Sequence, residues 1–276
     1  MAVIRLRKEA ENFIRSKCNG TGNSKLSGKN SYVLPYCSPL TSSSKIWTSN
    51  PTINGGITNN SELAEALIKI YNKYADIYEM DANVLVAQAY QESGFIIWNY
   101  AKTSTASSIS QFIAAAIYDV IILNKFGGFS IADREAISKN MIGYTFSSSP
   151  LPPKDAYLVD FSLGRQNRPI LHQNIIDNPD IMIRAQFIYM NWISKRCDKL
   201  ASCTLFGYNR GPGYVKSSSY PRAIDIASKV SKDYELEGID YVFKIFKNLY
   251  DNFGYKQLNI TEHAVQNFDK FYGNLG

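Results

Sequence analysis

A glutamate at the end of an apolar helical segment is the strongest candidate for acid–base chemistry in this sequence. Glu92 ends the segment 82–92, follows the apolar run 84–87 and is followed directly by Ser93 and Gly94. Burial raises the pKa of a carboxyl group, and so does the negative end of a helix dipole. A carboxylic acid that stays protonated near neutral pH can protonate the leaving oxygen of a glycosidic bond. On its own, however, a glutamate at a helix end is more often a solvated surface residue.

Segments further along the chain carry amide and aromatic side chains among glycine and proline. Residues 106–112 read Ala-Ser-Ser-Ile-Ser-Gln-Phe, and residues 207–215 read Gly-Tyr-Asn-Arg-Gly-Pro-Gly-Tyr-Val. Residues 178–192 begin with Asn-Pro-Asp and end with Tyr-Met-Asn-Trp, and residues 237–242 read Glu-Gly-Ile-Asp-Tyr-Val. Aromatic faces and side-chain amides bind sugar rings, which present C–H patches and hydroxyl groups. Each segment alone is also compatible with a turn, a polar helix end or a core helix.

Taken in order with residues 90–95, Tyr-Gln-Glu-Ser-Gly-Phe, these segments resemble the soluble lytic transglycosylase family, which is related to goose-type lysozyme. The resemblance covers roughly residues 62–250. It implies that Glu92 is the catalytic acid and base. The substrate-binding residues that it implies are Ser93, Gln111, Tyr208, Asn209 and Tyr241. The aromatic residues nearest to the motifs extend this set by Tyr214 and Trp98, with Tyr100 beside them.

The resemblance implies that peptidoglycan is cut between N-acetylmuramic acid and N-acetylglucosamine without water. Glu92 first protonates the glycosidic oxygen and then takes the proton of the C6 hydroxyl, which leaves a 1,6-anhydro end. A two-carboxylate hydrolase needs a second acid across the bond, and no Asp or Glu lies between Ser93 and Tyr118. The acids that precede Glu92 and could approach it through folding are Asp76, Glu79 and Asp81.

Three departures from the family pattern leave alternatives open. Ser108 and Ser110 stand where glycine and a methionine-like residue are usual, and Arg210 replaces alanine. Residues 113–177 exceed the usual spacer and indicate an enlarged insertion. One alternative is a hydrolytic muramidase of the goose-type lysozyme kind. The other is a non-catalytic wall-binding or structural module of a phage tail or secretion apparatus.

The elements that must position these residues are predicted to be mainly helical. Helical periods, caps and stop signals predict helices over 1–17, 61–74, 82–92, 110–123, 178–192, 221–231 and 236–250. Strand alternation is scarce, so we expect a mainly α fold, a lysozyme-like helical catalytic domain with a basic, loop-rich N-terminal extension. The predicted divisions are an arm or linker (1–60), the catalytic domain (61–250, with the insertion 113–177) and a C-terminal tail (251–276).

The net charge of +6 arises in residues 1–60, which hold eight Lys or Arg against two Glu. A basic arm of this kind can dock on an anionic polymer or on a phage tail or envelope assembly. Peptidoglycan is the expected partner, and nucleic acid is not. No segment is apolar enough to span a membrane, and no secretion signal is visible. The predicted site of action is the cell wall or periplasm, reached in a virion or by another non-standard route.

The cysteines and histidines predict neither a metal site nor a cofactor. Cys18, Cys37, Cys197 and Cys203 have no tight metal-ligand spacing, and only two histidines accompany them. Cys18 with Cys37, and Cys197 with Cys203, could each close a loop. Four cysteines allow three pairings, and four free thiols are a further alternative.

Overall fold

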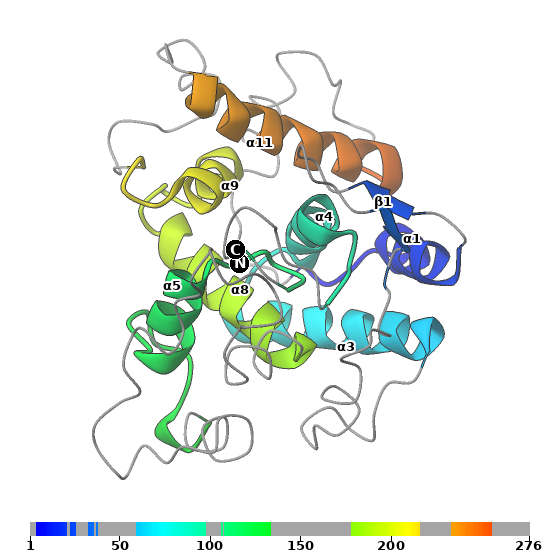
Figure 1. Cartoon of the computed structure of the whole chain (residues 1–276), viewed down its shortest axis with the longest axis horizontal. Helices are drawn as coiled ribbons and strands as arrows, with labels where there is room; N and C mark the ends of the chain where they lie inside the picture. Colours follow the sequence, from blue (N-terminus) through cyan, green and yellow to red (C-terminus); the bar gives the residue numbers. More distant parts are fainter. Residues whose placement is uncertain are drawn as a thin grey trace. The chain divides into compact units, whose positions relative to one another are not determined.

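The computed structural model describes residues 4–20, 23–25, 33–35, 37, 59–97, 106, 108–133, 178–215 and 233–255. Over these residues the chain is predominantly helical (Figure 1), which confirms the predicted mainly α class. The helices are α1 (Lys8–Asn19), α3 (Asn60–Tyr78), α4 (Ala82–Ser93), α5 (Ala114–Ile117), the π-helical turn η1 (Tyr118–Ile122), α8 (Pro179–Ser194), α9 (Ala201–Arg210) and α11 (Asp233–Asn252). The strands β1 (Asn23–Lys25) and β2 (Val33–Pro35) pair antiparallel, with Ser24 opposite Leu34. None of the helices in these ranges is long and apolar enough to cross a bilayer.

The chain divides into two compact units. The Asp81 unit comprises Met1–Phe13, Tyr71–Gln91 and Phe187–Gly276. The Glu92 unit comprises Ile14–Ile70 and Glu92–Gln186. The division falls within α1, α3, α4 and α8, so each of these helices contributes residues to both units.

Short polar side chains set the starts of α3 and α8. Oδ1 of Asn59 accepts a hydrogen bond from the backbone N–H of Glu62 at 2.9 Å. Oδ1 of Asn178 accepts one from the N–H of Ile181 at 3.2 Å. Such caps satisfy backbone donors that have no partner inside the first turn of a helix. Asn59 is the cap, so α3 begins at Asn60. The helix predicted from residue 61 therefore begins one residue too late.

In the Glu92 unit, the second half of α1 is attached at two points. Arg15 forms an ion pair with Glu65 of α3, with 2.6 Å between Nε and Oε1. Cys18 forms a disulfide with Cys37, and their Cα atoms are 4.8 Å apart. Both half-cystines are fully buried, as is Ile14 one turn before Cys18. Of the pairings that the sequence left open, this one closes the loop between α1 and Cys37.

The predicted helix 110–123 is wrong in its first part. Ser108 and Gln111 adopt φ angles of 67° and 49°, in the left-handed region that a right-handed helix cannot contain. Residues 108–111 therefore form a turn, in which the N–H of Gln111 donates to the carbonyl of Ser108 at 3.2 Å. Helical structure begins only with α5 and continues directly into η1.

Arg184 of α8 holds the segment 124–133 within the Glu92 unit. Its guanidinium binds the Asp133 carboxylate at 2.8 Å and the carbonyl of Gly128, and it lies 4.5 Å over the ring of Phe129. Burial raises the pKa of Asp133, but hydrogen bonds from Arg184 and Ser130 more than offset this and hold it at about 2. The Asp133 carboxyl is thus ionised at neutral pH.

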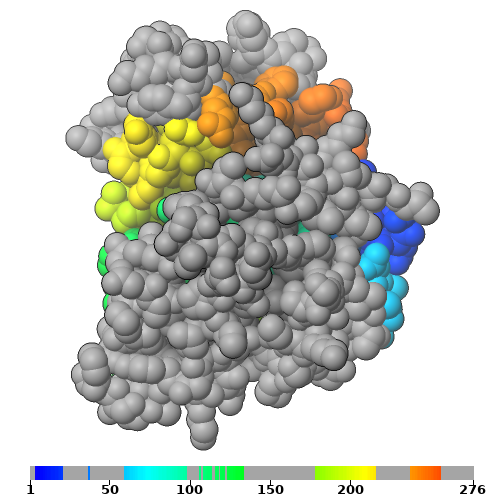
Figure 2. Space-filling model, viewed as in Figure 1, coloured from blue at the N-terminus to red at the C-terminus, as the bar shows by residue number. Residues whose placement is uncertain are grey.

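The interior of the Asp81 unit is rich in aromatic rings. Phe187 lies about 6 Å from the ring centres of Tyr71, Tyr74 and Tyr78. Helices α9 and α11 of this unit lie side by side (Figure 1). Their yellow and orange atoms adjoin on the face shown in Figure 2. Burial also raises the pKa of the Tyr71 hydroxyl, because it disfavours the charged form.

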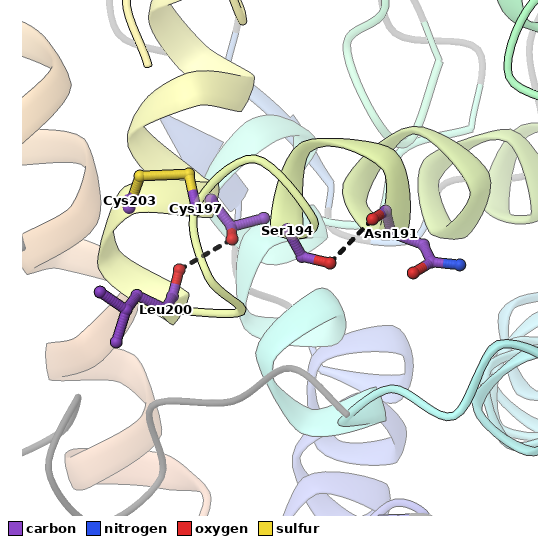
Figure 3. The surroundings of a disulfide bond; sticks show 6 residues. Asn191, Ser194, Cys197, Leu200 and Cys203 are labelled. Carbon is purple, nitrogen blue, oxygen red and sulfur yellow. Dashed lines mark hydrogen bonds between the residues drawn. A yellow bond between two sulfur atoms is a disulfide. The ribbon is translucent and has the colours of Figure 1, made fainter. Parts of the chain in front are cut away.

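The turn before α9 is closed by the Cys197–Cys203 disulfide (Figure 3). Just before it, at the end of α8, the Ser194 hydroxyl donates to the carbonyl of Asn191 at 2.8 Å, and within the turn the N–H of Leu200 donates to the carbonyl of Cys197 at 2.9 Å. Residues 201–207 of α9 are all buried. The helix therefore lacks the amphipathic period on which prediction relies, and the sequence pattern does not predict it.

Several predicted features lie outside the described residues. They are the helix 221–231, the aromatic residues Trp98 and Tyr100, most of the insertion 113–177 and the tail beyond Tyr255.

Candidate functional site

Glu92 lies in the last turn of α4, as the sequence predicts, and is half-buried. Gly94 and Phe95 follow with φ angles of 61° and 64°, which ends the helix. Residues 93–97 are all buried. Gly94 adopts this conformation without steric cost, whereas Phe95 pays a penalty that its full burial offsets. The glutamate therefore lies at a helix end that runs directly into a tight, buried turn.

Within the Glu92 unit, a hydrogen bond joins this turn to the segment 106–112. The hydroxyl of Ser93 donates to the carbonyl of Ile109 at 2.9 Å, and both residues are buried. The bond spans sixteen positions of sequence. It brings the Glu-Ser pair and the turn 108–111 together, although nothing in the local pattern of either segment indicates this contact.

Gln111, the predicted substrate-binding glutamine, is half-buried at the end of that turn. Its side-chain amide donates to the carbonyl of Ser108 at 2.8 Å. Ser108 stands where the family usually has glycine, yet it keeps a left-handed φ of 67°. Its buried hydroxyl makes no hydrogen bond. The conformation that glycine would favour is thus preserved with serine, at a cost of roughly 1–2 kcal/mol.

Cys37 approaches the turn after Glu92 from another part of the Glu92 unit. Its backbone N–H donates to the carbonyl of Gly94 at 3.2 Å. Cys37 is fully buried, has a φ of 55° and is held by the disulfide to Cys18. Sequence reasoning did not include Cys37 among the site residues. The pairing with Cys18 was the one signal that could have indicated it.

The segment 207–215 belongs to the Asp81 unit. Tyr208 and Asn209 occupy the last turn of α9, so they are helical, while Gly211 ends the helix with a φ of 95°. The Tyr208 ring packs edge-on against Tyr189, with 5.7 Å between ring centres. The side-chain oxygen of Asn209 is buried and accepts no hydrogen bond from the described part of the chain. Tyr214 follows on a turn and is 43% exposed.

Two glycines of the motifs are required by close packing. A Cβ at Gly207 would lie 2.7 Å from Cγ2 of Val215 and 2.9 Å from Cγ2 of Ile193. A Cβ at Gly238 in α11 would lie 2.7 Å from side-chain carbons of Phe206 and Arg210 in α9. Such distances are too short for carbon atoms, so glycine allows α9 and α11 to approach each other.

Arg210 and Tyr241 complete the described part of the motifs. Arg210, which replaces the usual alanine, forms an ion pair with Glu237 of α11 at 3.0 Å. Tyr241 lies on α11 and is buried, at 7% exposure. Burial of this degree is also what a core tyrosine would show. The ion pair between Arg210 and Glu237 links the segment 207–215 to the segment 237–242 within the Asp81 unit.

The acids that precede Glu92 are engaged elsewhere. Asp76 forms a bidentate ion pair with Arg5, in which Nε donates to Oδ1 at 2.9 Å and Nη2 donates to Oδ2 at 2.6 Å. The hydrogen bonds and charge of Arg5 lower the pKa of the Asp76 carboxyl. Glu79 is exposed. Asp81 accepts hydrogen bonds from Asn83 and Tyr255 within its own unit.

The predicted site residues thus fall into two groups. Glu92, Ser93 and Gln111 belong to the Glu92 unit, and Ser93 is bonded to the turn that carries Gln111. Tyr208, Asn209, Tyr214 and Tyr241 belong to the Asp81 unit. Within the described part of the chain, no cluster of three or more His, Cys, Asp or Glu could hold a metal ion. No family model, curated protein or solved structure was found to match this chain.

Proposed function

We propose that this protein is a peptidoglycan lytic transglycosylase with a lysozyme-like helical catalytic domain, and that Glu92 is its catalytic acid and base. The observation that carries the proposal is the hydrogen bond from Ser93 to the carbonyl of Ile109. It joins the Glu-Ser pair to the turn that ends in Gln111, and the resemblance assigns the catalytic glutamate to the first and a substrate-binding glutamine to the second. The half-buried position of Glu92 on a tight turn further supports the role.

The reaction needs one carboxyl group with two successive tasks. The Glu92 carboxyl protonates the oxygen between muramic acid and glucosamine as the C1–O bond breaks. The N-acetyl group of the muramic sugar stabilises the resulting cation. The Glu92 carboxylate then takes the proton of the C6 hydroxyl while the C6 oxygen bonds to C1, which regenerates the acid and forms the 1,6-anhydro ring. Atoms and protons balance without water.

The other residues hold the sugars in this proposal. Gln111, Asn209 and Ser93 supply polar groups, and Tyr208, Tyr214, Tyr241 and Trp98 supply aromatic surface. Asn209 is the best supported, because its buried side-chain oxygen has no hydrogen-bond partner among the residues that the structure describes. A buried acceptor of this kind costs free energy until a donor reaches it. An amide N–H or hydroxyl of a glycan is such a donor.

Digestion of purified peptidoglycan followed by mass spectrometry tests the proposal. We expect muropeptides with a 1,6-anhydro end, which lack one water relative to the products of hydrolysis. If the muropeptides instead contain the water added by hydrolysis, the protein is a hydrolytic muramidase of the goose-type lysozyme kind and not a transglycosylase. No cleavage in a zymogram with folded protein would favour a non-catalytic wall-binding module, an alternative to which the altered residues Ser108 and Ser110 lend support.

The proposed setting is the bacterial cell wall, reached in a phage particle or another delivery assembly. The basic segment 1–60 is the proposed docking element, because the positive net charge of the chain arises there. Detection of the chain in purified virions or envelope complexes tests this, and loss of association on deletion of residues 1–60 would assign the docking to that segment.

A further inference from the structure

We propose that the Cys18–Cys37 disulfide is a positioning clamp for the turn that carries Glu92, so that glycan cleavage requires this bond to be closed. The inference rests on the proposed function, because the clamp acts on the same site. Cys37 itself is a positioning residue and touches no substrate. The clamp consists of the disulfide and the hydrogen bond from the N–H of Cys37 to the carbonyl of Gly94.

The fixed side of the clamp is the second half of α1. Cys18 lies in the last turn of α1 and is 1% exposed, and Ile14 one turn earlier is fully buried. The ion pair between Arg15 and Glu65 attaches the same half of the helix to α3. Cys18 is therefore an anchor whose position does not depend on Cys37.

The other side of the clamp is the carbonyl of Gly94, two residues after Glu92. Gly94 and Phe95 both have left-handed φ angles, so the turn departs sharply from helical geometry. It is held at two neighbouring points by groups distant in sequence, through the hydroxyl of Ser93 to Ile109 and through the carbonyl of Gly94 to Cys37. Two such attachments leave the end of α4 little freedom to rotate.

The disulfide is needed because Cys37 does not favour its own conformation. A φ of 55° is unfavourable for a residue with a side chain, and full burial removes Cys37 from water. The disulfide to Cys18 offsets the cost of the unfavourable φ angle, because it lowers the conformational entropy of the unfolded chain. When the bond is opened, we expect Cys37 to leave the left-handed region and its N–H to leave Gly94.

The expected effect on catalysis follows from how far the Glu92 carboxyl is displaced from its working position. Misplacement of a catalytic group by about 1 Å can reduce the rate about 100-fold. We therefore expect a double variant, Cys18→Ala with Cys37→Ala, to show kcat reduced by about 100-fold with KM little changed. The fall in kcat without a change in KM separates positioning from loss of substrate contacts.

The chain contains its own matched control. The Cys197–Cys203 disulfide closes a turn in the Asp81 unit, and Cys197→Ala with Cys203→Ala removes it. We expect this variant to show faster amide hydrogen exchange in residues 195–203 and a kcat close to that of the parent. The Cys18–Cys37 variant should instead show faster exchange at residue 37 and at Ile96, whose N–H donates to the carbonyl of Ser93.

Reversible reduction supplies a test that needs no change at Cys18 or Cys37. Dithiothreitol converts each disulfide to two thiols and is itself oxidised to its cyclic disulfide. The parent and the Cys197→Ala, Cys203→Ala variant should lose activity on reduction and regain it when oxidised glutathione reforms the bond. Circular dichroism checks that the reduced chains stay folded. The Cys18→Ala, Cys37→Ala variant should not respond.

The outcomes separate the clamp from the proposed function. Hydrogen exchange reports on the turn whether or not the chain cleaves glycan. If exchange at residue 37 and Ile96 is unchanged when the disulfide opens, the clamp is overturned even in an active enzyme. If exchange increases and kcat stays at the parent value, the link to catalysis is overturned. If the parent itself never cleaves peptidoglycan, the proposed function fails and exchange alone decides on the clamp.

Discussion

The two ends of helix α4 each carry a carboxyl group, and the chain treats the two groups in opposite ways. Asp81 precedes the helix and is 3% exposed, whereas Glu92 lies in the last turn and is half-buried. Both sit next to buried apolar residues, so a hydrophobic neighbourhood does not distinguish them. The difference lies in how completely each side chain is enclosed and in which neighbouring groups hold the backbone around it.

Asp81 is enclosed by hydrogen-bond donors. Its Oδ1 accepts bonds from the backbone N–H and the side-chain amide of Asn83, both at 2.8 Å, and its Oδ2 accepts one from the Tyr255 hydroxyl at 2.8 Å. The guanidinium of Arg7 lies over the Tyr255 ring and donates to the carbonyl of Gly254. A carboxyl group engaged in this way fastens the N-terminal segment and the end of α11 to the start of α4.

The Glu92 end is built from attachments to the backbone around the carboxyl group. Ser93 bonds to Ile109, and Gly94 accepts from Cys37, so the turn is fixed while the glutamate is half-exposed. A catalytic acid must meet its substrate, whereas a structural carboxylate is most stabilising when every lone pair is used. The comparison therefore assigns stability to Asp81 and is compatible with the catalytic role proposed for Glu92.

The largest expected effect comes from Glu92→Gln. The amide can neither donate the proton to the glycosidic oxygen nor accept it from the C6 hydroxyl, so we expect turnover to fall about 1000-fold or more. Release of muropeptides measures this, and thermal unfolding should be unchanged. Asp81→Asn is the control and should cleave at the parental rate. Retained cleavage in Glu92→Gln would move the catalytic role to another residue.

The position of Glu92 at a helix end was more visible in the sequence than the contacts that hold the following turn. The apolar run, the glutamate and Gly94 predict a helix that ends near residue 92, and α4 ends at Ser93. Asn178 and Pro179 likewise predict the start of α8. These are local signals, in which each residue prefers the conformation that it adopts.

Long-range contacts explain what the sequence did not predict. Ser108 and Gln111 have left-handed φ angles that no local preference of serine or glutamine indicates. The bond between Ser93 and Ile109, and the choice among three cysteine pairings, depend on residues distant in the chain. Helix α9 was missed because its buried residues show no polar face. The helix ends were therefore predictable from local signals, but the long-range attachments of these segments were not.

The second largest effect is on stability, at the other end of α4. Asp81→Ala removes the cap of the helix and leaves three buried donors on Asn83 and Tyr255 without an acceptor. We expect a loss of about 2–4 kcal/mol in the free energy of unfolding, measured by urea denaturation. Tyr255→Phe removes only one of the bonds and keeps the ring under Arg7, so about 1 kcal/mol is expected. Equal losses in both variants would contradict a network centred on Asp81.

A pair of buried serines in the Glu92 unit tests the attachment of the turn. Ser93→Ala leaves the carbonyl of Ile109 without its donor, and we expect a loss of about 1–2 kcal/mol together with reduced turnover. Ser108→Ala removes a hydroxyl that makes no hydrogen bond and should be neutral or slightly stabilising. Unfolding curves of the two variants give the comparison. If Ser93→Ala proves as neutral as Ser108→Ala, the bond to Ile109 does not hold the turn.

The smallest effect is a change in how stability depends on pH. Burial raises the pKa of the Asp81 carboxyl, and the bonds from Asn83 and Tyr255 and the charge of Arg7 offset this only in part. The folded state therefore binds this proton more tightly than the unfolded state. The ionised carboxyl weakens folding as pH rises from about 4, the ordinary value for aspartate.

Asp81→Asn removes the titrating proton at this position from both the folded and the unfolded state, and it keeps the shape of the side chain. We expect the melting temperature of the parent, relative to Asp81→Asn, to rise as the pH is lowered from 7 towards 4. Acidification also weakens the ion pairs of Asp76 and Glu65, whose pKa values are lowered, in both proteins alike. The difference between the two melting curves isolates Asp81. A difference that is constant with pH would mean that Asp81 titrates as it does in water, and that its hydrogen bonds fully offset its burial.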